Sequence, residues 1–459
     1  MSDEPKRIPY HFTARDYQIE FLREINRAIR GESKKRFFYQ IWHRRSGKDK
    51  TDIADVAPKM LMQEPCLVKY VYPTLVMGRE NLWDGLGKDG FRYREHIAPF
   101  IRAGQPNNTR MTIPVKNGTE TPSQFQIAGS DKPDSLRGGN AKMYIFSEWA
   151  EQDPYAWDVV EPVLRENGGI AVFNTTPKGD NHARQMLEYA KNNPLWYVQL
   201  LTAEDTKIWT PKELEAIRDD IIRRFSSQGR SESEAITYFE QEYMCSFKAP
   251  VIGAYYGEAI SRAEREGRIT SVPVYEDQQV HTAWDLGMDD SMTIWFFQFI
   301  GQEIHFIDYY ESSGEGLAHY AQVLQEKGYL YGRHFAPHDI VVRELGTGKS
   351  RLETAKRLGI RFEVGAKLGI EEGINAARAI FSRCWFDDKR CYRGVNALKN
   401  YKKDWDEKNH VFRKTPLHNW ASHGSDAFRT FAVNGRQIVR VPQQTNFGGI
   451  KRIYEDLPG

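Results

Sequence analysis

The chain has 459 residues, of which 40% are hydrophobic, 27% charged and 13% aromatic, and this composition excludes the disordered, collagen-like and membrane-embedded classes of protein. At roughly 150 residues per domain, the length predicts two or three domains. The 64 basic and 62 acidic residues leave a net charge of +2, so total charge does not indicate a nucleic-acid partner, and without a long apolar run or an N-terminal signal we expect a soluble, intracellular protein.

The N-terminal half has the pattern of a parallel sheet covered by helices. Between residues 37 and 201, short apolar runs alternate with longer helix-patterned segments, and the runs are FFYQIW, LVKYVY, MYIF, IAVFNTT and WYVQLL. Residues 204–245 are highly charged and have Pro211 in a first-turn position, which predicts helices. We therefore predict an α/β domain at residues 1–203, followed by a helical lid or linker at residues 204–264.

The C-terminal half follows a different pattern, with a strand, a hairpin and then helices. HTAWDLG comes first, and TIWFFQFIGQEIHFIDYY follows with a turn at Gly301. Helical segments begin near Gly316. This pattern predicts a second α/β domain at residues 265–435. The last residues, 436–459, combine Pro442, glycines and mixed charge, so we expect a flexible tail.

The first chemical pattern is a possible phosphate-binding loop in FFYQIWHRRSGKDKTDIADVAPKML, which predicts a strand, a polar loop and a helix. At such a helix N-terminus, main-chain N–H groups bind phosphate oxygens, a glycine permits close approach and a lysine neutralises the phosphates. Gly47 and Lys48 supply the glycine and the lysine. Trp42 stands where G-x-x-x-x-G-K-[ST] has its first glycine, and Asp49 stands at its Ser/Thr position. A basic turn between a strand and a helix is the alternative.

Two later strand ends carry the polar groups that nucleotide hydrolysis needs. KMYIFSEWAE ends a predicted buried strand at Ser147 and Glu148, where a carboxylate can reach Mg²⁺ or polarise the attacking water. IAVFNTTPKG ends the next strand in Asn174, Thr175 and Thr176, which can contact the terminal phosphate. The order and spacing of the three segments favour nucleotide hydrolysis over ordinary strand ends.

Three separated aspartates form the third pattern. Asp285 follows HTAW, Asp339 follows RHFAPH, and Asp426 lies in HGSDAFRTFAV at the expected start of a helix capped by Ser425 or Ser422. In a ribonuclease H-like fold, acids from a first strand, a later strand and a C-terminal helix hold two metal ions. Two such ions activate water and stabilise the leaving oxygen in phosphodiester cleavage. The order of the aspartates therefore indicates a nuclease site, although single aspartates usually cap turns or helices.

These patterns, in this order, resemble the large terminase subunit of tailed bacteriophages, the motor that packages DNA into the procapsid. The resemblance covers nearly the whole chain, and its most specific parts are HRRSGKD, SLRGGNAKMYIFSEWAE, ELGTGKS and PLHNWASHGSDAFR. It implies a P-loop (RecA/ASCE-like) ATPase domain followed by a ribonuclease H-like endonuclease domain. It also implies ATP and Mg²⁺ as cofactors, with Mn²⁺ supporting cleavage. The implied partners are double-stranded DNA, the small terminase subunit and the portal protein, with a homo-oligomeric ring forming on the portal in the host cytoplasm.

The resemblance assigns roles to individual residues. The nucleotide-binding set, which includes an adenine-recognising glutamine and a coupling-motif threonine, is Gln18, Arg45, Ser46, Gly47, Lys48, Asp49 and Thr176. Glu148 activates water, and Arg137 is the arginine finger, with Arg79 as the alternative. Asp285, Asp339 and Asp426 are the catalytic metal ligands of the nuclease, whereas Asp289 and Asp290 are interpreted as turn residues that could contact metal indirectly.

Two departures from the family pattern lie in the nucleotide site. Ser147 replaces the aspartate that normally precedes the catalytic glutamate, and Asp49 replaces the usual Ser/Thr. One hypothesis is that Asp49 supplies, directly or through water, the metal contact that Ser147 weakens. A helicase or other translocase without nuclease activity is the first alternative function. A non-enzymatic assembly adaptor with degenerate sites is the second.

A basic segment with interleaved aromatic residues indicates where DNA could bind. Residues 378–414 contain eleven Lys or Arg and five acids, together with seven aromatic residues. The basic residues are the stronger candidates for contacts with phosphates. For the aromatic residues we favour the alternative, an amphipathic helix pair that buries them in a core.

Overall fold

The structure is a computed structural model, and it describes residues 8–248, 251, 253–287, 291–342, 350–406 and 411–435. The chain forms two compact units. The first unit comprises residues 1–266 and 391–425, and the second comprises residues 267–390 and 426–459. The predicted tail at 436–459, together with Asp289 and Asp290, lies outside the described residues.

The first unit is built on a seven-stranded sheet with the order β3-β4-β2-β5-β6-β1-β7. Neighbouring strands are parallel, except that β3 runs antiparallel to β4. The strands are β1 (Phe37–Trp42), β2 (Leu67–Tyr72), β3 (Thr112–Val115), β4 (Ser123–Gly129), β5 (Met143–Ser147), β6 (Ile170–Thr175) and β7 (Trp196–Leu201). The five runs predicted from the sequence are β1, β2, β5, β6 and β7, whereas β3 and β4 were not predicted.

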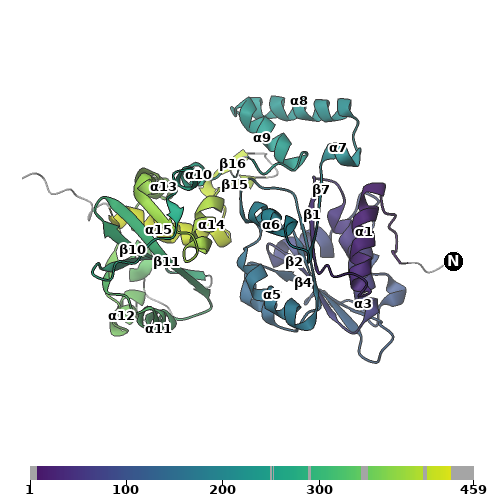
Figure 1. The fold of residues 1–459 in the computed structure, drawn as a ribbon, viewed down its shortest axis with the longest axis horizontal. Coiled ribbons are helices and arrows are strands. Elements are labelled where there is room, and N and C mark those ends of the chain that lie inside the picture. Colours follow the sequence, from purple (N-terminus) through teal and green to yellow (C-terminus); the bar gives the residue numbers. More distant parts are fainter. Residues whose placement is uncertain are drawn as a thin grey trace, which may run out of the picture. The chain divides into compact units, whose positions relative to one another are not determined.

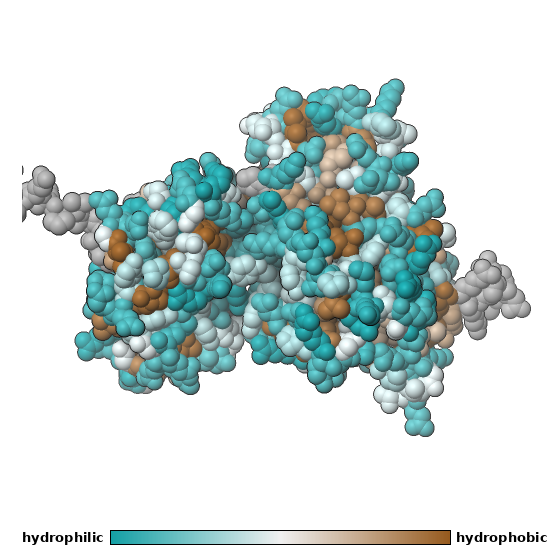
Figure 2. All heavy atoms as spheres, in the orientation of Figure 1, coloured by the Kyte–Doolittle hydropathy of each residue, from teal (hydrophilic) through white to brown (hydrophobic). Residues whose placement is uncertain are grey.

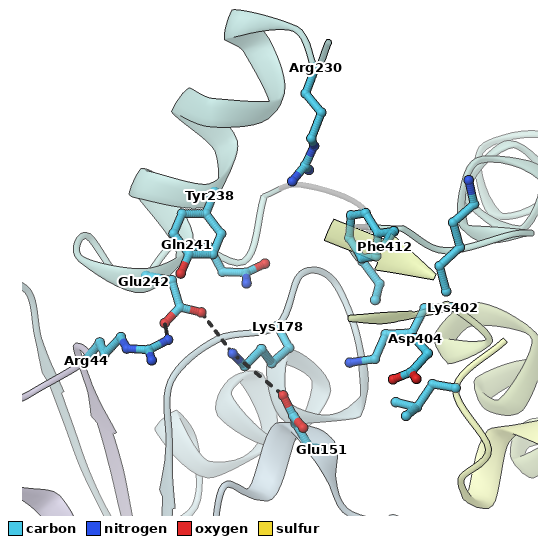
Figure 3. A pocket seen from close by; sticks show the side chains of 13 residues that line it. Arg44, Glu151, Lys178, Arg230, Tyr238, Gln241, Glu242, Lys402, Asp404 and Phe412 are labelled. Atoms are coloured by element: carbon cyan, nitrogen blue, oxygen red, sulfur yellow. Dashed lines mark hydrogen bonds and ion pairs between the residues drawn. The ribbon is translucent and has the colours of Figure 1, made fainter. Parts of the chain in front are cut away.

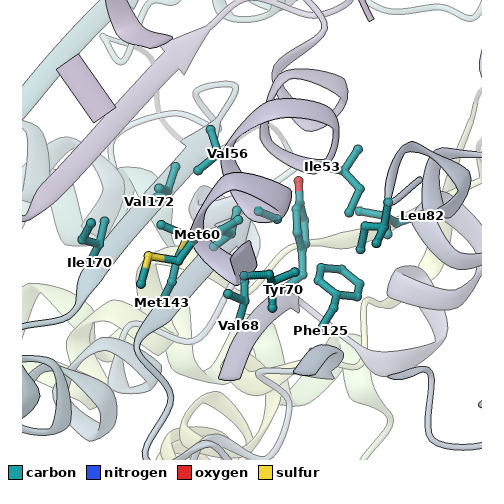
Figure 4. Packing of buried hydrophobic residues seen from close by; sticks show 14 of the residues in the cluster. Ile53, Val56, Met60, Val68, Tyr70, Leu82, Phe125, Met143, Ile170 and Val172 are labelled. Carbon is teal, nitrogen blue, oxygen red and sulfur yellow. The ribbon is translucent and has the colours of Figure 1, made fainter. Parts of the chain in front are cut away.

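Helices cover both faces of this sheet (Figure 1). On one face, α1 (Asp16–Ile29) and the segment formed by α2 (Lys48–Thr51), a short wider turn and α3 (Ala57–Gln63) pack over the strands. Figure 4 shows part of that core, in which Val56 and Met60 meet strand residues such as Val68, Met143 and Val172. On the other face lie α5 (Tyr155–Asn167) and α6 (His182–Lys191). The α/β prediction is confirmed for this unit, and β6 lies between β1 and β5, as in RecA/ASCE-like domains.

Helices follow the sheet, as the charge pattern predicts. They are α7 (Ala203–Thr206), α8 (Pro211–Ser227), α9 (Glu232–Glu242) and α10 (Gly257–Arg265). Thr210 caps α8 and Pro211 occupies its first turn, where the missing N–H of proline costs nothing. Figure 1 shows α8 and α9 side by side, and Phe225 and Phe239 belong to their shared apolar cluster.

The first unit also contains α14 (Tyr392–Asn400) and a hairpin of β15 (Lys403–Asp406) and β16 (Val411–Pro416). Our sequence boundaries place this segment in the C-terminal domain, but it groups with the first unit. A physical reason is that α14 packs on α10, where the Lys399 amine lies 3.0 Å from a carboxylate oxygen of Glu264.

The second unit is built on another seven-stranded sheet, with the order β13-β12-β9-β10-β11-β14-β8. The strands are β8 (Ile269–Thr270), β9 (Val280–Asp285), β10 (Ser291–Ile300), β11 (Glu303–Ser313), β12 (Tyr331–Ala336), β13 (Phe362–Val364) and β14 (Cys384–Asp387). The three strands β9, β10 and β11 are antiparallel, and β12 is parallel to β9. This is the strand arrangement of a ribonuclease H-like fold, so the predicted fold class is confirmed for this unit as well. Gly301, with a φ of +60°, makes the predicted hairpin turn between β10 and β11.

Helices also cover this second sheet. The helices of the unit are α11 (Leu317–Lys327), α12 (Arg351–Arg357), α13 (Ile370–Ile380) and the greater part of α15 (Trp420–Gly435). Leu324 of α11 and Ala355 of α12 share an apolar core with Trp284 and Ile294 of the sheet. From α15, Phe428 contacts Trp295 and Phe306 through ring contacts with centroids 5.9 and 5.3 Å apart.

Two local sequence interpretations are wrong. We expected a helix beginning at Asp426 with Ser425 or Ser422 as its cap, but α15 already begins at Trp420. Gly424 does not end the helix, because Ala421 and Phe428 on either side of it are fully buried and their packing outweighs the low helix propensity of glycine. The basic segment 378–414 is not a helix pair, although several of its aromatic residues, including Phe381, Phe386 and Tyr401, are buried as expected. It contains the end of α13, strand β14, helix α14 and the β15–β16 hairpin.

The surface view in Figure 2 shows a mainly hydrophilic face on which hydrophobic residues form small, separate patches. Of the helices in the described part of the chain, none is both long and apolar enough to cross a membrane.

Candidate functional site

The polar strand ends of the first unit meet at one edge of its sheet. Strand β6 lies between β1 and β5, and Ser147 pairs with Asn174 while Ile41 pairs with Thr175. Because these strands are parallel, the loops at their carboxyl ends lie next to one another. The predicted phosphate loop, Glu148 and Thr176 therefore belong to one site.

The loop before α2 contains two residues with a left-handed backbone and is bonded to side chains of α1. Arg45 and Gly47 both have positive φ angles, of 69° and 83°. The carbonyl oxygen of Ser46 accepts hydrogen bonds from the Tyr17 hydroxyl at 2.7 Å and from the Gln18 amide at 3.1 Å. A Cβ atom at Gly47 would lie 3.3 Å from that amide nitrogen, so glycine suits this position through both its φ angle and its small size. Gln18, the predicted adenine contact, thus forms a hydrogen bond to the main chain of the loop.

Lys48 lies at the centre of the site. Its ammonium nitrogen is 3.1 Å from Thr176 Oγ1 and 3.1 Å from Glu148 Oε1. Burial disfavours the charged form of Lys48, but the carboxylates of Glu148 and Asp49 outweigh burial and raise the pKa of this lysine. The structure therefore brings Lys48, Glu148 and Thr176 together, with a positive charge at the loop.

Glu148 occupies a strained backbone position. Its φ and ψ angles are 56° and 47°, in the left-handed region, and its N–H donates to Asn174 Oδ1 at 3.3 Å. For a residue other than glycine, this conformation costs on the order of 1–3 kcal/mol and is concentrated at functional sites. The left-handed backbone directs the Glu148 side chain toward Lys48 instead of along the strand.

A single carboxylate oxygen of Asp49 accepts hydrogen bonds from three segments. Its Oδ1 accepts from the Ser147 hydroxyl at 2.7 Å, from the Tyr70 hydroxyl at 2.8 Å and from the Asn174 amide at 3.0 Å. Burial and the charge of Asp49 hold the pKa of Tyr70 well above its usual value, so this hydroxyl keeps its proton and donates. The residue at the Ser/Thr position of the loop is therefore a carboxylate held in place by three donors.

Asn174 joins Asp49 to a second, fully buried acid. The same amide nitrogen donates to Asp52 Oδ2 at 2.8 Å, and the Gln40 amide donates to Asp52 Oδ1 at 3.1 Å. Burial, together with the nearby charge of Asp49, holds the pKa of Asp52 well above its usual range. Of these two acids, Asp52 is fully buried and Asp49 is the more exposed.

The predicted arginine fingers lie apart from this cluster. Arg137 is exposed, pairs with Asp134 at 3.2 Å and donates to the Tyr155 hydroxyl at 3.2 Å. Arg79 donates to the carbonyl oxygen of Asn108 at 3.0 Å. Within the described residues, neither arginine contacts Lys48 or Glu148.

A cavity of about 250 Å³ adjoins the phosphate loop, and Figure 3 shows its charged lining. Glu242 of α9 is buried, accepts a hydrogen bond from Lys178 at 2.8 Å and lies 3.5 Å from Arg44 of the loop. Lys178, two residues after Thr176, also lies 3.6 Å from Glu151. Burial works against the charge of Glu242, but Lys178 and Arg44 lower its pKa. This ion-pair chain links the loop, the end of β6 and the helical segment.

The predicted nuclease acids line one cavity of the second unit. Asp285 at the end of β9, Asp339 in a short 3-10 helix after β12 and Asp426 in α15 line one cavity of about 190 Å³. His338 and Arg429 line it as well, and Arg429 lies 3.2 Å from Asp426 Oδ1. A divalent cation takes carboxylate oxygens as ligands, so the donor chemistry fits such an ion. In the part of the chain that the structure describes, however, no three His, Cys, Asp or Glu residues form a compact ligand set.

Comparisons with known proteins give a likeness in structure only. No protein-family model and no curated protein matches the sequence. The chain is similar in fold to phage large terminases. The large terminase of a thermophilic bacteriophage is 13% identical, with a TM-score of 0.39, and the match covers 92% of this chain and 99% of that one. The ATPase domain of a Thermus phage large terminase is 19% identical over 51% of this chain and 100% of its own, with a TM-score of 0.37. The Mn-bound nuclease domain of the bacteriophage SPP1 large terminase is 16% identical over 37% and 95%, with a TM-score of 0.29.

Two residues next to the nucleotide site, Tyr70 and Asp52, were not assigned roles from the sequence, and Asn174 was expected to contact the terminal phosphate instead of Asp49 and Asp52. Tyr70 lies near the end of LVKYVY, Asp52 follows Asp49 by one helical turn, and Asn174 precedes the predicted Thr176. The signal for Asp52 and Asn174 was present, because a polar residue directly beside a phosphate loop or at a buried strand end needs a partner. Tyr70 had no such signal, because tyrosine is common in buried strands.

Proposed function

We propose that this chain is a DNA-packaging motor subunit that hydrolyses ATP to translocate double-stranded DNA and cleaves concatemeric DNA with a second, metal-dependent site. The observation that carries the ATPase proposal is the position of Lys48, whose ammonium nitrogen is 3.1 Å from both Glu148 and Thr176. A lysine that joins a phosphate loop to two neighbouring strand ends can bind the terminal phosphates of a nucleotide.

The loop residues fit a nucleotide in two further ways. The Ser46 hydroxyl is buried and has no hydrogen-bond partner in the described structure, so a phosphate oxygen is a suitable acceptor for it. Gly47 leaves the start of α2 open to a phosphate. In the proposed reaction Lys48 neutralises phosphate charge and Glu148 orients the attacking water, while Thr176 contacts the terminal phosphate. Mg²⁺ bound by the acids of this site would neutralise further phosphate charge.

The nuclease proposal depends on the cavity shared by Asp285, Asp339 and Asp426. Divalent cations bound there would activate water and stabilise the leaving oxygen of a phosphodiester. The protein's own contribution is to hold three carboxylates around one opening, where they repel one another until cations neutralise them.

The separation of the two activities tests this proposal. Lys48→Ala should abolish ATP hydrolysis and leave plasmid nicking in Mn²⁺ intact, whereas Asp339→Asn should do the reverse. Loss of both activities in either folded variant would contradict the assignment of one site to each unit. A helicase without nuclease activity predicts strand separation and no effect of Asp339→Asn, and an assembly adaptor predicts no hydrolysis at all.

The remaining roles follow from the same proposal. A homo-oligomeric ring on the portal protein, with the small terminase subunit and DNA as partners, would let Arg137 act on a neighbouring subunit, which suits its exposed position. Mixing Arg137→Ala protein with Glu148→Gln protein should then restore activity, because one interface would combine an intact arginine with an intact site. No recovery at any mixing ratio under assembling conditions would remove Arg137 from this role, and Arg79 would be tested next.

A further inference from the structure

We infer that Asp49 and Ser147 have exchanged the usual chemical roles of loop and strand: the carboxylate that binds the nucleotide's metal ion is on the helix, and the hydroxyl that orients it is on the strand. This inference deepens the proposed ATPase function and depends on it. In P-loop NTPases generally, a loop Ser or Thr and a strand aspartate hold Mg²⁺ together. Here the same two positions carry Asp49 and Ser147, and their side chains are hydrogen-bonded at 2.7 Å.

The geometry supports an exchange over a simple loss of the metal site. The Ser147 hydroxyl donates to Asp49 Oδ1, so a carboxylate and a hydroxyl are in contact at these two positions. Here the carboxylate is on the helix and the hydroxyl is on the strand, the reverse of the usual arrangement. Ser147 is fully buried, which fixes its hydroxyl, whereas Asp49 is partly exposed. The exposed end of the pair is therefore the carboxylate, as metal binding requires.

The hydrogen bonds of Asp49 leave one oxygen for a ligand role. Ser147, Tyr70 and Asn174 all donate to Oδ1, and within the described residues no hydrogen bond or ion pair reaches Oδ2. Hydrogen bonds to one oxygen orient the carboxylate and fix the direction of the other. Ser147, Tyr70 and Asn174 are thus positioning residues, and Asp49 Oδ2 is the ligand atom.

Asp52 is a contrasting acid on the same helical segment. Gln40 donates to its Oδ1 at 3.1 Å and Asn174 donates to its Oδ2 at 2.8 Å, so both oxygens are engaged. The side chain is fully buried. It can hold Asn174 in place but offers no oxygen to a metal ion. The matched control for the loss of one carboxylate is the next acid of this segment, Asp55, whose two oxygens accept hydrogen bonds from Lys59 at 2.8 and 2.7 Å.

The test measures the coupling between metal and nucleotide. ADP affinity is measured by calorimetry in EDTA and in Mn²⁺, and bound Mn²⁺ is counted by electron paramagnetic resonance. Wild-type protein should bind ADP at least tenfold more tightly with Mn²⁺. Asp49→Asn should lose this gain while keeping its affinity in EDTA, and Asp55→Asn should keep the gain. Ser147→Ala should reduce the gain, and Ser147→Thr, which retains the hydroxyl, should restore it.

The reciprocal double variant gives the sharpest result. Asp49→Ser combined with Ser147→Asp returns each group to the segment where P-loop NTPases usually carry it, and the gain from Mn²⁺ should return to within about threefold of wild type. If this double variant does not fold, the comparison of Asp49→Asn with Asp55→Asn still decides the question. A full gain from Mn²⁺ in folded Asp49→Asn would overturn the inference. Failure of the wild-type protein to bind ADP would instead contradict the proposed function.

Discussion

Replacing Glu148 by glutamine should tighten nucleotide binding and stop turnover. In the structure, Lys48 is held 3.1 Å from Glu148, so this ion pair must open before the lysine can turn to a phosphate. At an effective dielectric constant of about 20, two charges at this distance attract by about 5 kcal/mol. The desolvation of both groups reduces the net value to about 1.5 kcal/mol, as for other hydrogen bonds to charged groups. Removing the pair should therefore raise affinity roughly tenfold.

The assay is calorimetric titration with a non-hydrolysable ATP analogue, together with steady-state hydrolysis of ATP. Glu151→Gln is the matched control, because it removes the same charge three residues away while its partner is Lys178 at 3.6 Å. The control should bind the analogue with an affinity within about twofold of wild type. Unchanged or weaker binding by Glu148→Gln would refute the reasoning about the ion pair, and near-normal turnover would refute the role of Glu148 in orienting water.

Three further predictions concern the nuclease cavity, the buried ion pairs and acid stability. Asp426→Ala should abolish Mn²⁺-dependent plasmid nicking because it removes a metal ligand, and it should change the melting temperature in EDTA only slightly, because it removes both a repulsive charge and the ion pair with Arg429 at 3.2 Å; full nicking activity would contradict the proposed site. Glu242→Gln should lower the free energy of unfolding, measured in urea, by about 2–3 kcal/mol. This loss is smaller than for a fully buried ion pair, because Lys178 is 22% exposed. A loss below about 0.5 kcal/mol would show that the pair contributes little. Burial lowers the pKa of His182 to about 4. As the pH falls below about 6.5, the histidine binds a proton in the unfolded chain before it does so in the folded protein. The free energy of unfolding should therefore decline by up to about 3 kcal/mol by pH 4. His182→Gln should lack this part of the pH dependence, and an unchanged slope of stability against pH would contradict the assignment.

The sequence was sufficient to predict the central strands of both sheets. FFYQIW, LVKYVY and MYIF are continuous apolar runs because parallel strands in the middle of such a sheet are buried on both faces. Strand β3 is at the edge of the first sheet and β4 lies next to it. TIPV is short and SQFQIAG alternates with polar residues, so their signal was weak. The early start of α15 was missed because Gly424 suggests a helix end, and only the burial of the residues around it shows otherwise.

Much of the nucleotide site could be placed from strand ends alone. Because parallel strands present their carboxyl ends at one edge, the positions of Lys48, Glu148 and Thr176 implied that they meet. The hydrogen bond between Asp49 and Ser147, which are 98 residues apart, could not be predicted, because side-chain direction at a strand end depends on local packing. The left-handed backbone of Glu148 could not be predicted from the sequence either, since nothing in the residue type predicts a positive φ.

One measurement tests the central claim most directly: ATP hydrolysis and plasmid cleavage by the same purified preparation, with and without linear double-stranded DNA and with Mg²⁺ or Mn²⁺. We predict that ATP hydrolysis is present and rises with DNA, and that plasmid is nicked only when a divalent cation is present. Protein that is folded by circular dichroism but neither hydrolyses ATP nor nicks DNA under any of these conditions would contradict the account.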